Sequence, residues 1–203
     1  MIFKPMTGST QGISSNACPL NFSGENLASA LLQRKLSFAS YSESMPEAGY
    51  QGCSNGAYKR KHNPVANWPA LSAYNLPYSQ FPQDYAQLPT VALVVPDQLG
   101  DMHDGSIAEG DAWLEQEIEP YVQWALKHNS LLIVTWDEDD GSEGNRIATI
   151  MVGAMVKPGT SAQRINHYTL LRTLSAMYDL PVLGESRQEK PISGIWRAPA
   201  RKR

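Results

Sequence analysis

The sequence contains little of what marks several large classes of protein. Its 203 residues include only two cysteines, Cys18 and Cys53, which excludes a disulfide-framework fold, and their spacing does not fit a zinc ribbon. No apolar run approaches the roughly 18 residues of a membrane span, so we expect no transmembrane segment. The net charge of -3 gives no reason to expect a nucleic-acid partner. The first residues lack the pattern of a signal sequence. We expect one domain over residues 1–203.

Common phosphate-binding and nucleophile motifs are also missing from the sequence. There is no Gly-x-x-x-x-Gly-Lys-Ser/Thr loop, no Gly-x-Gly-x-x-Gly and no Gly-x-Ser-x-Gly. An EF-hand beginning at Asp137 would place Ser142 where glycine is required and Ala148 where glutamate is required. A nucleotide-binding loop, a serine-hydrolase elbow and an EF-hand are therefore excluded.

Strand and helix patterns alternate along the chain, which predicts an α/β fold. Residues 44–87 interrupt the alternation with a long irregular excursion, which its many aromatic side chains are expected to keep packed and ordered. A helix over residues 25–35 is expected to be capped by Ser23 and Gly24, and a later helix to be interrupted near Pro120. The remaining predicted elements are strands over 36–41, 91–95, 131–136 and 147–152 and helices over 107–127 and 168–178.

The most informative segment is the junction at residues 131–141. Six apolar or β-branched residues are followed by Asp137, Glu138, Asp139 and Asp140. Such a run predicts a strand buried on both faces of a parallel sheet, and ligands bind at the carboxyl ends of such strands. The four carboxylates form either a solvated acidic turn or a site for a divalent metal, which would relieve their mutual repulsion.

A second polar loop, residues 97–105, follows the strand over 91–95 and contains His103 between two aspartates. Because the carboxyl ends of parallel strands share one edge of a sheet, this loop and the acidic cluster are expected to converge. His62 lies in another polar loop, after the basic run that begins at Lys59, which either binds an anion or is solvated. His128 is explained by its place at a helix end. His167 either caps the last helix or reaches the site.

Several segments together resemble the bacterial phosphoesterase family that contains acid phosphatases and phospholipase C-type enzymes. The resemblance covers nearly the whole chain, in the family's order. It implies an alkaline-phosphatase-like three-layer sandwich with a mostly parallel central sheet. The segments that carry it are Gly8–Gly12, Tyr58–Pro64, Asp101–Ser106, Trp136–Gly141 and Asn166–Thr173.

The resemblance also implies a metal-dependent phosphoester hydrolase of acid phosphatase type, acting on a small phosphomonoester or a phospholipid. It places Asp137 and Glu138 as ligands of a divalent metal ion and His62 and His103 as phosphate contacts, with Asp139 and Asp140 in supporting roles. Oxygen ligands suit a hard cation, and imidazoles can donate hydrogen bonds to phosphoryl oxygens. The family is usually exported, so the resemblance further implies a secreted or periplasmic protein with Cys18 bridged to Cys53.

The chain departs from the family at its beginning. Family members carry, ahead of the segment that matches Gly8–Gly12, a first strand that ends in a Glu-Asn metal pair and then a Ser or Thr nucleophile. Glu25–Asn26 opens a predicted helix and does not match that pair, and the resemblance places none of Thr7, Ser9 and Thr10 as nucleophile. The chain is therefore expected to be the carboxyl-terminal portion of a phosphoesterase, without its first strand. Two alternatives are a catalytically inactive remnant and a non-enzymatic acidic-loop metal-binding module.

Overall fold

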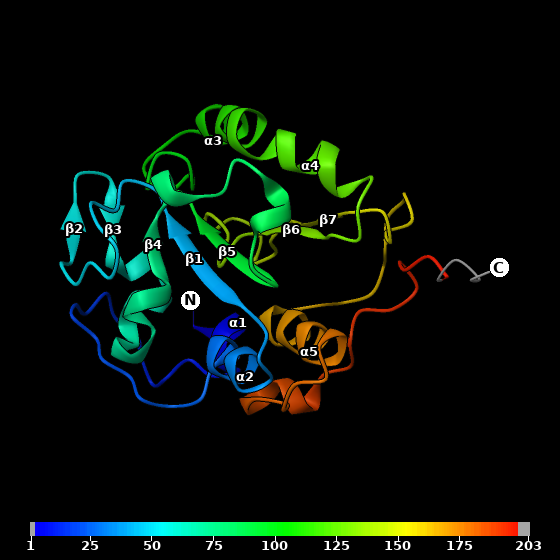
Figure 1. The fold of residues 1–203 in the computed structure, drawn as a ribbon, viewed down its shortest axis with the longest axis horizontal. Helices are drawn as coiled ribbons and strands as arrows, with labels where there is room; N and C mark the ends of the chain where they lie inside the picture. Colours follow the sequence, from blue (N-terminus) through cyan, green and yellow to red (C-terminus); the bar gives the residue numbers. More distant parts are fainter. Residues whose placement is uncertain (1–2, 199–203) are drawn as a thin grey trace.

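The computed structural model describes residues 3–198, which are arranged in three layers (Figure 1). Helices α3 (Ile107–Trp113) and α4 (Glu119–Ala125) lie on one side of the strands. Helices α1 (Lys4–Thr7), α2 (Leu27–Gln33) and α5 (His167–Met177) lie on the other. The predicted α/β class is confirmed.

The central sheet has the strand order β4-β1-β5, and its strands are parallel. Strand β1 (Phe38–Ser42) is fully buried because it has a neighbour at each edge and a layer over each face. Strand β5 (Val91–Val95) has the predicted bounds, yet all its residues are half-buried. Strand β4 (Asn75–Pro77) completes the sheet.

Strand β6 (Leu132–Thr135) corrects one prediction. All its residues are half-buried, whereas the sequence predicts burial on both faces. It pairs antiparallel with β7 (Thr149–Val152) in a separate two-stranded sheet, and among the described residues neither strand is hydrogen-bonded to the parallel sheet. Its apolar composition predicts a covered strand, but the neighbour that would cover its second edge is not among the described strands.

The excursion over residues 44–87 is ordered, as predicted. It contains the antiparallel pair β2 (Ser54–Asn55) and β3 (Tyr58–Lys59), and it contributes β4 to the sheet. The sequence does not reveal β4, because a three-residue strand ending in proline has no clear period. The Cys18–Cys53 disulfide, which is confirmed, joins the excursion to the amino-terminal loop. The 3-10 helices of the excursion are Arg60–His62, Val65–Asn67, Pro69–Tyr74, Tyr78–Gln80 and Tyr85–Gln87.

The helix ends differ in how well the sequence predicts them. Asn26 caps α2 through a reciprocal pair of hydrogen bonds with Ser29, so the expected cap at Ser23 and Gly24 is wrong. Between α3 and α4 the chain makes a π-helical turn, Leu114–Ile118, and Pro120 lies in the first turn of α4, which confirms the predicted interruption. A last 3-10 helix spans Gly184–Gln188.

The hydrophobic core lies between the parallel sheet and helices α1, α2 and α5. Its fully buried members include Leu31 on α2, Leu171 on α5 and Val65 in the excursion. In the part of the chain that the structure describes, no helix is both long and apolar enough to cross a membrane.

Candidate functional site

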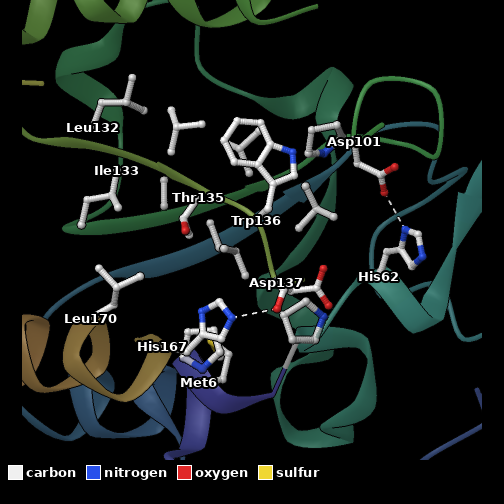
Figure 2. A pocket seen from close by; sticks show the side chains of 18 of the residues that line it. Met6, His62, Asp101, Leu132, Ile133, Thr135, Trp136, Asp137, His167 and Leu170 are labelled. Atoms are coloured by element: carbon white, nitrogen blue, oxygen red, sulfur yellow. Dashed lines mark hydrogen bonds and ion pairs between the residues drawn. The ribbon is translucent and has the colours of Figure 1, made fainter. Parts of the chain in front are cut away.

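A cavity of about 2070 Å³ lies between β5 and β6. Its walls along the strands are apolar, and at the carboxyl ends of β5 and β6 it becomes polar, where His62, Asp101, His103 and Asp137 line it. Figure 2 shows this end, with Asp137 between His167 and the His62–Asp101 pair. The two polar loops that the sequence expects to converge therefore do so.

Asp101 holds both histidines of the polar end. Its Oδ2 lies 2.5 Å from His62 Nδ1, and its Oδ1 accepts a hydrogen bond of 2.9 Å from the backbone N–H of His103. The two imidazole rings meet edge to face with 4.8 Å between their centroids, and Lys61 Nζ lies 3.4 Å from His103 Nε2. Lys61, His62, Asp101 and His103, hereafter the histidine cluster, thus come from two segments about forty residues apart in the sequence.

His62 is positioned by the residue that follows it. Asn63 is completely buried, and its side chain donates to Asn75 Oδ1 at 2.8 Å, on strand β4. Its Oδ1 accepts from the backbone of Ala66, which closes the turn after His62. Because a buried amide without partners is costly, this network keeps His62 in place relative to the parallel sheet.

The basic run before His62 divides into two roles. Arg60 is buried, and its guanidinium donates to the backbone carbonyls of Gln51 and Leu20 at 2.6 and 2.8 Å. Lys59 donates to the carbonyl of Gly56. Lys61 and His62 alone of this run line the cavity, so the anion-binding possibility is confined to them.

The loop after β5 is shaped by one buried residue and one glycine. The carbonyl of Gln98 accepts hydrogen bonds from the backbone N–H groups of Asp104 and Gly105, at 2.9 and 3.1 Å. A Cβ on Gly105 would lie 2.1 Å from the carbonyl oxygen of Leu99, so no other residue fits there without a backbone shift. This closed loop presents Asp101 and His103 to the cavity.

His167 connects α5 to the acidic segment. It is the first residue of α5, and Asn166 caps the helix instead, so the capping alternative is wrong. His167 Nε2 donates to the backbone carbonyl of Asp137 at 2.9 Å, as the dashed line in Figure 2 marks. Burial lowers the pKa of His167, although the hydrogen bond to Asp137 opposes this shift. A neutral imidazole therefore positions the residue that leaves β6.

The four acidic residues after β6 separate by role. Asp139 accepts from the backbone N–H groups of Gly141, Glu143 and Asn145, and Asp140 accepts from Ser142, and these bonds hold the pKa of each carboxyl below its usual value. Both therefore organise the loop, as the sequence expects of supporting residues. Asp137 is half-buried at the cavity and Glu138 is exposed at its rim.

A divalent metal needs more ligands than this end of the cavity offers. Within residues 3–198, no three His, Cys, Asp or Glu side chains gather in a way that could hold a metal ion. Magnesium is commonly bound through one or two carboxylates, with waters and substrate phosphate as its other ligands. Asp137 and Glu138 therefore fit part of a metal site, which the described side chains alone do not complete.

The hydroxyls near the beginning of the chain belong to local turns. Thr7 Oγ1 bonds to the backbone carbonyl of Phe3 at 3.0 Å, Ser9 Oγ accepts from the N–H of Gln11, and Thr10 Oγ1 accepts from that of Gly12. None of the three lines the cavity.

Asp101 completes the site but has no assigned role in the sequence prediction, whereas Lys61 belongs to the basic run that the sequence predicts either to bind an anion or to be solvated. The spacing Asp-x-His at residues 101–103 is a usable signal, because an aspartate often bonds to the backbone N–H two residues on. The partnership of Asp101 with His62 has no comparable signal, since the two residues lie far apart in the sequence.

These features define an α/β protein with a polar site at the carboxyl ends of its strands. The model of the Phosphoesterase family matches residues 6–181, and the chain belongs to this family. It is similar to a phosphatidylinositol-3-phosphatase of Mycobacterium tuberculosis, with 46% identity over 193 residues. It is also similar to a phosphate-repressible acid phosphatase of Penicillium chrysogenum and a probable acid phosphatase of Kluyveromyces lactis, each at 29% identity.

The matches cover more of this chain than of its relatives. The chain is matched over 93%, 74% and 78% of its own length, whereas it covers 64%, 41% and 43% of the three relatives, in the same order. The chain thus spans less than two thirds of each of these proteins.

Proposed function

We propose that this chain carries the phosphate-binding part of a phosphoester hydrolase of acid phosphatase type. The observation that supports this most directly is the histidine cluster beside Asp137 at the carboxyl ends of β5 and β6. The Nδ1 of His62 is hydrogen-bonded to Asp101, so Nε2 is the ring nitrogen that can contact a ligand. Together with His103 and the ammonium of Lys61, it can donate hydrogen bonds to the oxygens of a phosphoryl group.

His62 and His103 are the proposed phosphate contacts, and Asp101 is a positioning residue that acts through them. Phosphate monoesters hydrolyse very slowly without a catalyst, so neutralising the phosphoryl charge lowers a large barrier. An imidazole at this place can also give a proton to a leaving alkoxide. The substrate class is a phosphomonoester, and the name of the relative from Mycobacterium tuberculosis makes a phosphoinositide one candidate within this class.

Asp137 and Glu138 are proposed to provide two oxygen ligands of a divalent metal ion, whose charge would add to that of the histidine cluster. The remaining ligands would be waters, substrate oxygens or groups other than the described side chains. We therefore propose that Asp137 presents its carboxylate to the cavity, and that the hydrogen bond from His167 to the backbone carbonyl of Asp137 fixes its position.

A second candidate is a chain that binds phosphate and does not turn it over. The incomplete ligand set among the described residues favours it. It shares the histidine cluster with the first candidate, and the two differ only in catalysis. An acidic-loop module that binds metal alone would need no histidine cluster.

Titration calorimetry with inorganic phosphate tests the shared part of the proposal. His62→Gln is expected to weaken phosphate binding about tenfold, since it removes one charge-assisted hydrogen bond. His128→Gln is the matched control, because His128 stacks on Trp124 and does not line the cavity. Equal binding by wild type and His62→Gln would contradict the proposed phosphate site.

Hydrolysis of a chromogenic phosphate monoester, with and without added divalent metal, separates the two candidates. Metal-dependent turnover that Asp137→Ala abolishes is expected of the enzyme. Phosphate binding without turnover under any metal condition would leave the second candidate.

Export to an oxidising compartment is proposed from the disulfide. The Cys18–Cys53 bridge is of the kind that persists in secreted and periplasmic proteins and is rare in reducing cytosol. Thiol counting on protein isolated from its native compartment should find no reactive thiol, and two reactive thiols in the folded protein would refute the proposal.

A further inference from the structure

Residues 14–21, hereafter loop 14–21, have few polar tethers to the rest of the molecule. Within residues 3–198, no backbone N–H of this loop donates a hydrogen bond to a backbone carbonyl. The Cys18–Cys53 disulfide joins the loop to the excursion just before β2, and Figure 1 shows the loop and the β2–β3 hairpin on the same side of the molecule. Cys53 is exposed, so a thiol in solution can reach the bridge.

Arg60 provides the second tether of this loop. Its guanidinium donates to the backbone carbonyl of Leu20 at 2.8 Å and to Oδ1 of Asn21 at 3.3 Å. It also donates to the carbonyl of Gln51, two residues before Cys53, at 2.6 Å. The backbone N–H of Arg60 donates to the carbonyl of Cys53 as well, at 3.0 Å. Arg60 therefore connects the two segments that the disulfide joins.

The positive charge of Arg60 makes these hydrogen bonds necessary. Arg60 is 1% exposed, and among the described residues no carboxylate forms an ion pair with it. A buried charge without hydrogen-bond acceptors is strongly unfavourable. If loop 14–21 moves away, the guanidinium loses two of its three acceptors, and we expect it to turn toward water.

Arg60 is continuous with the proposed phosphate contacts. It begins the 3-10 helix Arg60–His62, so a movement of Arg60 is transmitted to Lys61 and His62 within one tight turn. His62 is paired with Asp101, and Lys61 Nζ lies 3.4 Å from His103 Nε2. Arg60 itself does not line the cavity, so it can affect phosphate only through these neighbours.

We infer that the disulfide regulates phosphate binding through Arg60, so that Lys61 and His62 bind phosphate tightly only while the bridge is closed. This inference rests on the proposed phosphate contacts and adds redox control to them. While the bridge is closed, loop 14–21 supplies Arg60 with acceptors. When it opens, Arg60 loses them, and His62 separates from Asp101. The chain thus reaches its full phosphate affinity only in an oxidising compartment.

Opening the bridge is a thiol–disulfide exchange, for which a dithiol is the reductant. One thiolate of the dithiol attacks Sγ of Cys53, the S–S bond breaks, and Cys18 leaves as a thiolate that takes up the proton lost by the dithiol. The second thiol of the dithiol then attacks the mixed disulfide and releases Cys53 as a thiol. Two electrons pass to the bridge, and the dithiol ends as a cyclic disulfide.

Titration calorimetry with inorganic phosphate, on the whole chain with and without a dithiol, measures the coupling. Opening the bridge should weaken phosphate binding roughly fivefold or more, because the charge-assisted contacts lengthen. The titrations are made well below the melting temperature of the reduced protein, and circular dichroism checks that it is folded. Equal affinity with the bridge closed and open would overturn the inference.

A variant of Arg60 shows whether the bridge acts through this residue. Arg60→Met removes the buried charge at similar volume, a change that often preserves stability. With the bridge closed, it should bind phosphate as weakly as the reduced wild type. Opening the bridge should cause no further loss, because both changes interrupt the same connection. Losses that multiply, or wild-type affinity in closed Arg60→Met, would contradict the route; the second result decides even if the reduced chain unfolds.

Two further variants provide controls. Lys59 belongs to the same basic run, but it donates to the carbonyl of Gly56 and does not line the cavity, so Lys59→Met should match the wild type with the bridge closed and open. Arg60→Lys keeps a charge but lacks the fork that reaches two segments, and its affinity should lie between those of wild type and Arg60→Met. An equal loss in Lys59→Met would assign the effect to general disturbance of the run.

The imidazole of His62 gives a readout that does not require phosphate. With the bridge closed, its Nδ1 proton, hydrogen-bonded to Asp101, should give a downfield NMR signal that is absent from His62→Gln. Adding a dithiol should weaken or remove this signal, and an unchanged signal would refute the coupling. If neither form binds phosphate while the signal still depends on the bridge, the proposed function fails and the redox coupling holds.

Discussion

Strands β1 and β6 show that composition does not decide burial in this protein. Strand β1 reads Phe-Ala-Ser-Tyr-Ser and is completely buried, although it contains Ser40 and Ser42. Strand β6 reads Leu-Ile-Val-Thr and is half-buried throughout. Among the described strands, the first has a paired neighbour at each edge and the second has one at a single edge. Neighbours, rather than the apolar content of the strand, determine how much water reaches it.

Removing the disulfide should have the largest effect on this contrast, because the bridge stabilises the β1 side of the molecule and not the β6–β7 hairpin. Replacing Cys18 and Cys53 by alanine should lower the free energy of unfolding by about 4 kcal/mol, because the bridge closes a loop of 35 residues. Urea denaturation measures the loss. Hydrogen exchange should accelerate in the excursion and not in β6, and equal acceleration in both would mean that the two regions unfold as one unit.

Core truncation should separate the two sides more directly. Leu171→Ala, at a fully buried position of α5, should cost about 3 kcal/mol through lost contacts and a residual cavity. Ile133→Ala in β6 should cost less than half as much, since this residue is only partly buried. Chemical denaturation of both variants provides the comparison, which fails if the two losses are equal.

His167 links α5 to the end of β6, and its removal should have an intermediate effect. His167→Leu removes the hydrogen bond to the carbonyl of Asp137 and should cost about 1 kcal/mol. His167→Gln can keep a donor at this place and serves as its control. A wild-type stability for His167→Leu would mean that this bond contributes nothing.

The same residue predicts a pH dependence. Burial lowers the pKa of His167 in the folded state below its ordinary value of 6.5, so the unfolded chain binds more protons. Its contribution to stability is therefore complete above about pH 6.5 and declines as the pH falls through the lowered pKa. The midpoint temperature of thermal unfolding should fall more steeply below pH 6.5 for the wild type than for His167→Gln. Parallel profiles would contradict the shift.

The buried serines of β1 predict the smallest effect. The hydroxyl of Ser40 is buried and lacks a hydrogen-bond partner among the described residues. Ser40→Ala should leave stability unchanged or raise it by less than about 1 kcal/mol, because it removes an unsatisfied polar group and little volume. A clear loss of stability in urea denaturation would show that the hydroxyl has a partner, such as a bound water.

The prediction from sequence succeeds where the signal is local and periodic. Strand β5 has the predicted bounds, α5 begins one residue from the predicted start, and the break before Pro120 is found where proline disfavours a helix. The cap of α2 is missed because Ser23 and Gly24 are plausible by residue type alone, whereas Asn26 is selected by its reciprocal bonds with Ser29. Strand β4 is missed because three residues carry no period.

In the candidate site, too, the sequence predicts features with a local signal and misses contacts between distant segments. The loops after β5 and β6 both line the cavity, as predicted, but the rule that parallel strands end at one edge does not explain it, because β6 pairs with β7 outside the parallel sheet. The contact between His62 and Asp101, the bond from His167 to Asp137 and the separate fate of Arg60 do not follow from any local pattern. The assignment of His62, His103, Asp137 and Glu138 to phosphate and metal stays a prediction.

The sequence by itself determined the α/β class, the family and the candidate site residues. Each of these depends on periodicity, turn residues and motifs formed by positions that are close in the sequence. Only the tertiary structure decided that β6 pairs with β7, that Asp101 holds both histidines, and that β5 and β6 border an open space. Each of these depends on which distant segments become neighbours. The junction at residues 131–141 illustrates both: its strand and acids are evident from the sequence, and its incomplete burial is evident only from what lies beside it.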